Sequence, residues 1–242
     1  MSLPRIYQPI ILKPKSEVKL SDDASHYISR VMRYAIQDKI ILFNGQGGEY
    51  LSAIKEITKK SVIVFIQEFV SQEVESPLKI CLAQGISRGE KMDFTIQKAV
   101  ELGVTSVVPL FTERCNVKLD KERSEKRIQH WQAVAVSACE QSGRNIVPEI
   151  QSITTLLDFL NTKPEGTKLI LSPTAETKLS QTKIASQNIT ILIGPEGGFS
   201  DNEINLAINS EFQPICLGPR ILRTETAALA AISALQTLCG DF

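Results

Sequence analysis

Two short apolar segments near the end of the chain constrain its fold most, because each runs into a glycine-proline turn and then a helical pattern. Residues 189–193 (ITILI) precede the first glycine and proline, and residues 214–217 (PICL) precede the second. Short apolar runs bounded by glycine and proline are typical of buried strands. Two such strand–turn–helix units predict an α/β fold with one ligand site built from both turns.

The segments that follow the two turns carry helix signals. Ser200, with Glu203 three residues later, has the spacing of a capping box, which predicts a helix directly after the first turn. The second turn leads into residues 227–238 (AALAAISALQTL), which are apolar on nearly every face of a helix. Surface helices are amphipathic, so we expect this helix to be buried in a core or against another subunit.

The first turn, residues 194–198 (GPEGG), contains three glycines, which let backbone N–H groups approach a ligand where a Cβ would collide. Alone, such a turn fits a simple tight turn as well as a ligand loop, but pairing with the second turn favours the ligand loop. The sequence has neither a phosphate-binding P-loop motif nor a GxGxxG dinucleotide motif, so a nicotinamide cofactor in its usual mode is not expected.

Composition narrows the class of protein. The 242 residues suffice for one large domain or two modest ones, and no apolar run approaches the roughly 20 residues that span a bilayer. No secretory signal is visible, and the five cysteines are widely spaced without a Cys-x-x-Cys pair, which excludes zinc and disulfide frameworks and predicts a cytoplasmic protein. The formal net charge is zero, which permits local basic clusters for RNA without demanding them.

The first 72 residues show mostly strand periodicity. Residues 39–43 and 49–54 read as a hairpin opened by an Asn-Gly turn, and residues 61–66 as a further strand. Residues 22–33 predict a short helix with an acidic cap, whose apolar face holds Tyr27, Ile28, Val31 and Met32. We therefore expect a small β-barrel-like domain that carries one helix.

A polar stretch closed by a proline at residue 77 suggests a domain boundary, and strands and helices alternate after it. The expected strands are 79–83, 106–110 and 168–171, and the expected helices are 93–102 and 121–142. This alternation predicts a mostly parallel sheet covered by helices. Trp131 falls on the apolar stripe of the second helix and is expected in the core, and His26 and His130 are not expected to be catalytic.

Five segments carry a resemblance to a known family. They are 193–200 (IGPEGGFS), 217–227 (LGPRILRTETA), 97–104 (QKAVELGV), 140–144 (EQSGR) and 26–33 (HYISRVMR). Together they resemble the RsmE family, the 16S ribosomal RNA uridine-N3 methyltransferases of the SPOUT superfamily. The resemblance covers essentially the whole chain in order and is weakest over residues 156–187.

The resemblance implies a C-terminal SPOUT methyltransferase domain (73–242) whose end is threaded as a trefoil knot, and an N-terminal PUA-like RNA-binding β-barrel domain (1–72). It implies S-adenosylmethionine as cofactor, 16S rRNA of the small subunit as substrate, a homodimer, and neither a metal nor a membrane. Cofactor-binding residues implied by the match are Leu171, Gly194, Pro195, Glu196, Gly197, Gly198, Leu217, Gly218, Ile221, Leu222, Thr226 and Ala227.

Catalytic roles are expected in the second turn. A guanidinium beside the uracil oxygens would stabilise the negative charge that forms when N3 loses its proton, and Arg223 is the first candidate and Arg220 the second. The alternative for both is an ion pair with Glu196 or Glu225, or contact with a helix end. Glu225 itself could accept the proton, orient Arg223 or cap the helix.

RNA contacts are expected from His26, Arg30, Arg33, Arg88, Lys91 and Arg144. Each alone could simply belong to a solvated surface, so the expectation rests on the set.

The sequence leaves two alternative functions open. Another SPOUT enzyme could methylate a tRNA ribose 2′-hydroxyl, but such enzymes usually carry Ser-Leu-Asn where this chain has residues 223–227 (RTETA). A non-catalytic RNA-binding or assembly factor would keep the fold without cofactor affinity.

Overall fold

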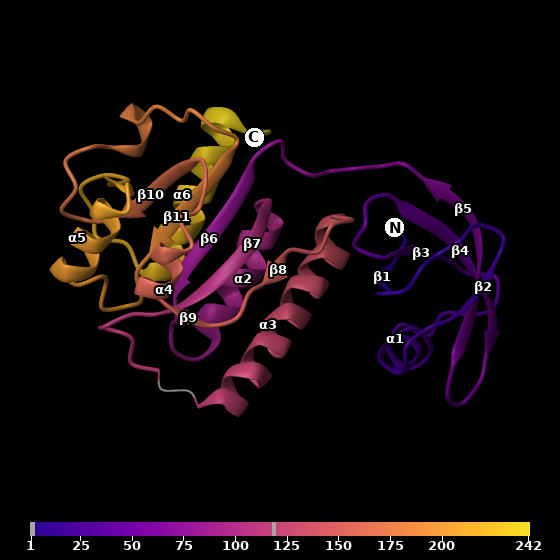
Figure 1. Ribbon diagram of the computed structural model, residues 1–242. Coiled ribbons are helices and arrows are strands. Elements are labelled where there is room, and N and C mark those ends of the chain that lie inside the picture. Colours follow the sequence, from indigo (N-terminus) through magenta and orange to yellow (C-terminus); the bar gives the residue numbers. More distant parts are fainter. Residues whose placement is uncertain (1–2, 118–119) are drawn as a thin grey trace. The chain divides into compact units, whose positions relative to one another are not determined.

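The computed structural model describes residues 3–117 and 120–242. The chain forms two compact units (Figure 1). Unit 1 comprises Met1–Glu75 together with Cys139–Val147, and unit 2 comprises Ser76–Ala138 together with Pro148–Phe242. Within the described ranges, none of the helices combines the length and apolar character needed to cross a bilayer.

Unit 1 is built on a five-stranded sheet with the order β1-β3-β4-β5-β2. Its strands are β1 (Arg5–Tyr7), β2 (Glu17–Lys19), β3 (Lys39–Phe43), β4 (Glu49–Ile57) and β5 (Val62–Val70). The predicted hairpin is confirmed, because β3 and β4 pair antiparallel, as do β4 and β5. Strands β1 and β2 have three residues each, too few for an alternating pattern to reveal them in the sequence.

The predicted helix at residues 22–33 is shorter than expected and changes type. Helix α1 (Asp22–His26) starts at Ser21, whose hydroxyl accepts from the backbone of Ala24, and it continues as a π-helical turn, η1 (Tyr27–Val31). The wider turn breaks the 3.6-residue period. The expected apolar face is therefore wrong in part: Ile28 is buried, whereas Tyr27, Val31 and Met32 are exposed (43%, 58% and 43%).

The late segment Cys139–Val147 is bonded to the N-terminal part of unit 1. The backbone N–H of Tyr7 donates to Glu140 Oε1 at 2.9 Å, and Asn145 Nδ2 donates to the carbonyl of Gln72 at 2.6 Å. Burial raises the pKa of Glu140, against the opposing effects of the Tyr7 N–H and the Arg5 charge. Unit 1 is therefore assembled from two stretches that lie far apart in the sequence.

Unit 2 is built on a seven-stranded sheet with the order β12-β10-β11-β6-β7-β8, and β9 also pairs with β7. Its strands are β6 (Lys79–Gly85), β7 (Val104–Phe111), β8 (Glu149–Ile150), β9 (Thr154–Thr155), β10 (Thr167–Leu171), β11 (Asn188–Ile193) and β12 (Gln213–Ile215). All of these pairings are parallel, which confirms the predicted sheet type. The central strand β11 is buried along residues 189–193, as a strand covered on both faces must be.

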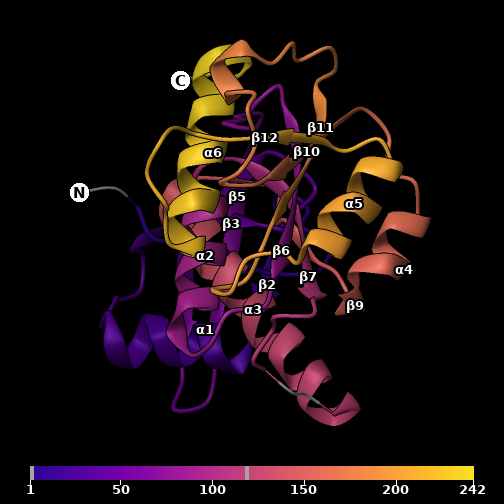
Figure 2. The ribbon, with the colours of Figure 1, turned by 90° about the vertical axis from the view of Figure 1, so that its left-hand side faces the viewer.

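Helices cover both faces of this sheet (Figure 2). Helices α2 (Glu90–Glu101) and α6 (Thr224–Cys239) lie on one face, and α4 (Leu156–Asn161) and α5 (Asp201–Asn209) lie on the other. The long helix α3 (Lys121–Ser142) contacts α2, because Trp131 Nε1 donates to Asp93 Oδ1 at 3.0 Å. Trp131 is buried as predicted, and His130 contacts the same carboxylate. A 3₁₀ turn, η2 (Leu179–Gln181), precedes β11.

Helix α6 is buried along one face, except near its C-terminal end. Five of its apolar side chains lie in the core: Ala227, Ala228, Ala231, Ile232 and Leu235. Near the C-terminal end of the helix Leu238 is 50% exposed, and Ala234, Thr237 and Leu238 line a hollow of about 310 Å³ together with Leu179 and Leu217. The predicted burial is thus confirmed within unit 2 for most of the helix, and its apolar C-terminal end is open.

Candidate functional site

The two glycine-proline turns line one cavity of about 760 Å³ in unit 2. The first turn follows β11 and the second follows β12, and the carboxyl ends of parallel strands share one edge of a sheet. The cavity wall consists of Lys91, Arg114, residues 171–174, 193–199, Asp201, Ile204, residues 216–218, 220–224 and Ala227. A volume of this size lies within the range of small-molecule and cofactor sites, about 300–1,000 Å³.

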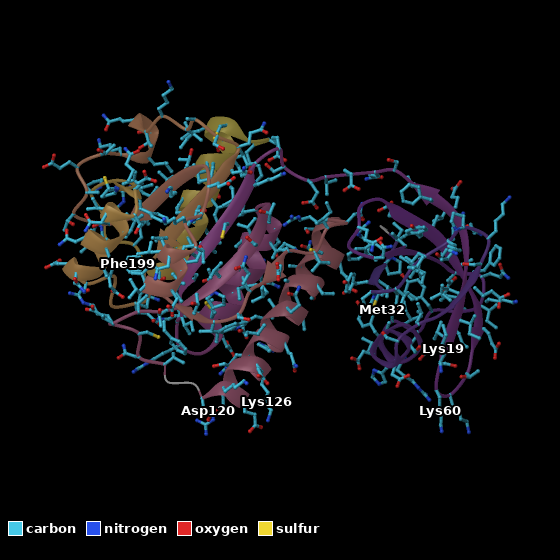
Figure 3. The ribbon with its side chains drawn as sticks, in the orientation of Figure 1. Lys19, Met32, Lys60, Asp120, Lys126 and Phe199 are labelled. Atoms are coloured by element: carbon cyan, nitrogen blue, oxygen red, sulfur yellow. The ribbon has the colours of Figure 1, made fainter. Side chains whose placement is uncertain are left out.

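The first turn is held by its own packing. A Cβ on Gly194 would lie 2.9 Å from the carbonyl carbon of Gly198, because the chain folds back on itself there. Phe199 is 6% exposed and packs among apolar residues of α4 and α5, and Figure 3 labels it on that side of the sheet. The compact return therefore requires a glycine at position 194, whatever ligand the turn meets.

The predicted capping box at the start of α5 is confirmed. The Ser200 hydroxyl accepts from the backbone N–H of Glu203 at 3.1 Å, and Glu203 Oε2 accepts from the backbone N–H of Ser200 at 2.9 Å. Glu203 is only 4% exposed and its other oxygen accepts from the backbone N–H of Glu113 at 2.8 Å. This carboxylate thus joins the first turn to the segment after β7.

Glu196, in the same turn, is paired on the cavity rim. Its Oε1 accepts from the backbone N–H of Arg88 at 3.1 Å and from Lys91 Nζ at 3.2 Å. Burial alone would raise the pKa of Glu196, but hydrogen bonds from its own backbone N–H, from Arg88 and from Lys91 outweigh burial and lower it. The carboxylate is therefore charged at neutral pH and is not partnered by Arg220.

The second turn is far more open. Ile221 is 86% exposed, and Arg220 and Arg223 are exposed as well. Within residues 3–117 and 120–242 neither arginine forms an ion pair, so the alternative of a structural pair with Glu196 or Glu225 finds no support. Glu225, in the first turn of α6, has a buried Oε2 without a partner in the described part of the chain.

A buried hydrogen-bond chain links the two turns. Gln84 Nε2 donates to Thr224 Oγ1 at 2.9 Å, and Thr224 Oγ1 donates to the carbonyl of Gly194 at 2.6 Å. Gln84 was not among the sequence candidates, and its only signal was a polar residue in an apolar strand next to a glycine. Thr224 lay inside the recognised motif without an assigned role.

The structure places the expected cofactor-binding residues together, with one exception. Thr226 is exposed on α6 and does not belong to the cavity wall, whereas the other eleven line it. Of the catalytic candidates, Arg220 and Arg223 line the cavity and Glu225 does not.

The RNA-contact candidates divide into three groups. The first group, His26, Arg30 and Arg33, is exposed in unit 1, within or just after α1. The second group lies in unit 2, where Arg88 is exposed and Lys91 is half-buried on the cavity rim. The third group is Arg144 alone. Arg144 has to be corrected. It is 3% exposed, and its guanidinium pairs with Glu75 within unit 1, so its charge is used in the interior of that unit.

Further cavity residues were missed by sequence reasoning. Arg114 Nη1 donates to the carbonyl of Gly197 at 3.2 Å, and Ser172 is buried with its hydroxyl 2.9 Å from Thr174 Oγ1. Arg114 lies in no recognised motif and reaches the cavity only through the order of the strands, whereas Ser172 directly follows the predicted cofactor-binding residue Leu171. With Arg114 included, the wall carries four cationic side chains and two carboxylates.

The described residues contain no group of three or more His, Cys, Asp or Glu side chains arranged to hold a metal ion. All five cysteines are free thiols.

Comparison with known proteins agrees with this site. Residues 74–236 match the model of an RNA methyltransferase domain, and residues 20–67 match that of an RNA methyltransferase PUA domain. Ribosomal RNA small subunit methyltransferase E of Buchnera aphidicola subsp. Schizaphis graminum is 42% identical over 99% of this chain and 98% of its own length.

Two solved structures are similar along their whole length. Ribosomal RNA small subunit methyltransferase E of Neisseria gonorrhoeae, bound to S-adenosylmethionine, has a TM-score of 0.96 at 43% identity, with all of both chains covered. A Legionella pneumophila methyltransferase in complex with the same cofactor has a TM-score of 0.97 at 42% identity, again over all of both chains. The chain therefore belongs to the ribosomal RNA small subunit methyltransferase E family.

Proposed function

We propose that this chain uses S-adenosylmethionine to methylate N3 of a specific uridine in 16S rRNA of the small ribosomal subunit. The observation that carries the proposal is the single cavity formed by both glycine-proline turns. Family membership supports the activity, since the relatives are named for the small-subunit RNA and two similar structures hold the cofactor.

The cavity suits a nucleoside cofactor in size and lining. Apolar side chains such as Leu171, Leu217 and Leu222 can hold a flat ring, and the first turn offers backbone groups for polar contacts. The residues proposed to hold the cofactor are Leu171, Gly194, Pro195, Glu196, Gly197, Gly198, Leu217, Gly218, Ile221, Leu222 and Ala227. When bound, S-adenosylmethionine supplies a methyl group on a positively charged sulfur. Thr226 is left out of this set because it lies outside the wall.

Arg223 is the proposed electrostatic catalyst. Its guanidinium is exposed, unpaired among the described residues and part of the cavity wall, so it is free to meet the uracil oxygens as N3 loses its proton. Arg220 is the second candidate on the same grounds. Glu225 lies outside the wall and has one buried carboxylate oxygen without a partner among the described residues, so it is proposed to orient Arg223.

RNA binding is proposed for an N-terminal PUA-like barrel domain (1–72), with residues 73–242 as the SPOUT methyltransferase domain whose end forms a trefoil knot. His26, Arg30 and Arg33 in the first domain and Arg88 and Lys91 beside the cavity are the proposed RNA contacts. N3 lies on the Watson–Crick edge, so the target uridine must be unpaired during the reaction.

A homodimer is proposed from the open apolar C-terminal end of α6. Ala234 and Leu238 line an open hollow beside Leu179, and a second copy of the chain would remove this apolar area from water. The proposed substrate, 16S rRNA of the small subunit, places the work of the enzyme in the cytoplasm.

The proposal is tested with small-subunit RNA, labelled cofactor and two arginine variants. Arg223→Ala is expected to bind S-adenosylmethionine normally and to lose about 10²–10³-fold in methylation rate, because a preorganised donor to the developing charge is gone. Arg127→Ala, on the exposed face of α3 and outside the cavity wall, is the control and should retain the rate. Normal turnover by Arg223→Ala would remove Arg223 from the mechanism.

The two rival functions are separated by binding and product analysis. Calorimetry with S-adenosylmethionine distinguishes the enzyme from a non-catalytic RNA factor, which would show no affinity. Nucleoside analysis of the product distinguishes methylation at N3 from methylation of a ribose hydroxyl.

A further inference from the structure

Three segments distant in the sequence converge on the carbonyl of Gly194. Thr224 Oγ1, at the start of α6, donates to it at 2.6 Å, and Gln84 Nε2, near the end of β6, lies 3.4 Å from it. Gln84 Nε2 also donates to Thr224 Oγ1 at 2.9 Å and to the carbonyl of Gly85 at 3.0 Å. An amide NH₂ has two hydrogens, so the two shorter contacts are its main bonds. The result is a directed chain from Gln84 through Thr224 to Gly194.

The end of β6 also presses directly on the first turn. A Cβ on Gly85 would lie 2.5 Å from the nitrogen of Pro195 and 2.6 Å from its Cδ. Contacts below 3.0 Å are essentially never made by a real Cβ, so only glycine permits this approach. Close packing and the hydrogen-bond chain therefore act at the same point.

The hydrogen bonds from Gln84 through Thr224 to Gly194 are buried, which raises the free-energy cost of breaking them. Gln84 is 0% exposed and Thr224 is 6% exposed, so their donors have little access to bulk water as an alternative partner. Gln84 Oε1 has no partner in the described part of the chain. The amide thus serves only as a donor, and turning it over would set its oxygen against two carbonyl oxygens. The donor-to-acceptor direction of these hydrogen bonds is therefore fixed by the surrounding carbonyl groups.

We propose that Gln84 and Thr224 are positioning residues, which hold the end of the second turn in register with the beginning of the first. This inference rests on the proposed function. Thr224 directly follows Arg223, so the bond to Gly194 sets where the proposed catalytic arginine leaves the backbone. Gln84 does not belong to the cavity wall, so it acts through Thr224 and the turn.

The test removes the bonds while preserving shape. Thr224→Val exchanges the hydroxyl for a methyl group, and Gln84→Met keeps the length of the side chain without its donors. The matched control is Thr95→Val in α2, because Thr95 is 1% exposed, its hydroxyl donates to the carbonyl of Lys91 at 2.8 Å, and it does not line the cavity. Cofactor Kd, kcat and KM for RNA are measured well below each variant's Tm.

Each of Thr224→Val and Gln84→Met is expected to raise the S-adenosylmethionine Kd about tenfold, equivalent to about 1.4 kcal/mol, and to lower kcat. KM for RNA should stay the same, since neither residue is among the proposed RNA contacts. The double variant should be little worse than either single one, because both break the same chain. Thr224→Ser, which retains the hydroxyl, should recover most of the affinity, and Thr95→Val should keep the Kd of the unaltered protein.

Two results would overturn the inference in distinguishable ways. If the variants lose thermal stability as Thr95→Val does but bind cofactor and turn over normally, the bonds are structural only and the positioning role is wrong. If the unaltered protein itself shows no affinity for S-adenosylmethionine, the proposed function falls first and the inference falls with it.

Discussion

The two glycine-proline turns share a motif and a cavity, yet the chain holds them very differently. In the first turn the Gly194 carbonyl is bonded by Thr224, Phe199 is anchored in the core, and Glu196 is paired with Lys91. In the second turn Ile221 is 86% exposed and its neighbouring arginines have no ion pair among the described residues. The first turn is held by hydrogen bonds, an ion pair and core packing, and the second presents exposed side chains.

This difference suggests a division of work between similar sequence elements. A braced wall can hold a cofactor in one orientation, which supplies much of the rate of a two-substrate reaction. Exposed arginines can meet a polyanionic substrate and stabilise charge that appears only during reaction. The comparison therefore predicts that changes in the first turn act through stability and cofactor affinity, and that changes at Arg220 and Arg223 of the second turn act through turnover.

The largest effect is expected from Gly85→Ala, which disrupts the close packing of β6 against Pro195 in the first turn. The added Cβ would meet Pro195 backbone at 2.5 Å, and overpacking of this kind costs about 3 kcal/mol of unfolding free energy. Urea denaturation and cofactor calorimetry measure the outcome, and cofactor binding should be lost. Gly218→Ala in the second turn meets no atom within 4 Å and has only its φ of 146° to overcome, so about 1 kcal/mol is expected. Equal losses of unfolding free energy in the two variants would contradict the inferred difference between the two turns.

A smaller effect is expected from Ile221→Ser in the second turn. Because the side chain is 86% exposed, the unfolding free energy should change by less than about 0.5 kcal/mol. The side chain lines the cavity, so loss of its apolar contact should lower kcat/KM by about tenfold. Ile208→Ser, at a 44% exposed isoleucine of α5 outside the wall, is the matched control. A large loss of stability in Ile221→Ser would show that the second turn is braced too.

The smallest effect concerns pH and Glu196. Its pKa lies below the ordinary value of 4.5, so the charged form contributes stability above that value and loses it as pH falls through the folded-state pKa. Glu196→Gln should flatten this acid limb in both stability and cofactor affinity, by less than about 1 kcal/mol because the pair with Lys91 is partly exposed and screened by solvent.

Glu211→Gln provides the control for this pH experiment. The hydrogen bond and charge of Lys168 lower the pKa of Glu211, which lies outside the cavity wall. Its removal should alter acid stability without altering the pH dependence of cofactor affinity. An unchanged affinity profile in Glu196→Gln would separate that carboxylate from the site.

Much of unit 2 could be predicted, because its strands are apolar runs with clear ends. The joint cavity also followed from the sequence, since parallel strands bring their carboxyl ends to one edge. Gln84 could not be identified in the same way, because its partners Thr224 and Gly194 lie far along the chain. Arg114 was missed for the same reason, as its place depends on the position of β7 beside β6.

Unit 1 was harder to predict, for local reasons. The π-helical turn at Tyr27–Val31 breaks the period on which the apolar face was assigned, so Tyr27 and Met32 proved exposed. Arg144 looked like a surface cation because a sequence does not show Glu75 closing on it from 69 residues away. A buried ion pair between distant residues has no local pattern.

The two-stretch assembly of unit 1 limits how this protein can be dissected. A fragment ending at residue 72 would deprive the Tyr7 N–H of Glu140 and the Gln72 carbonyl of Asn145. Such a fragment would lack a segment of its own unit, residues 139–147, and not merely a neighbouring domain. Loss of RNA affinity in a truncated protein would then measure misfolding, so the role of the N-terminal part has to be mapped by point substitution in the full chain.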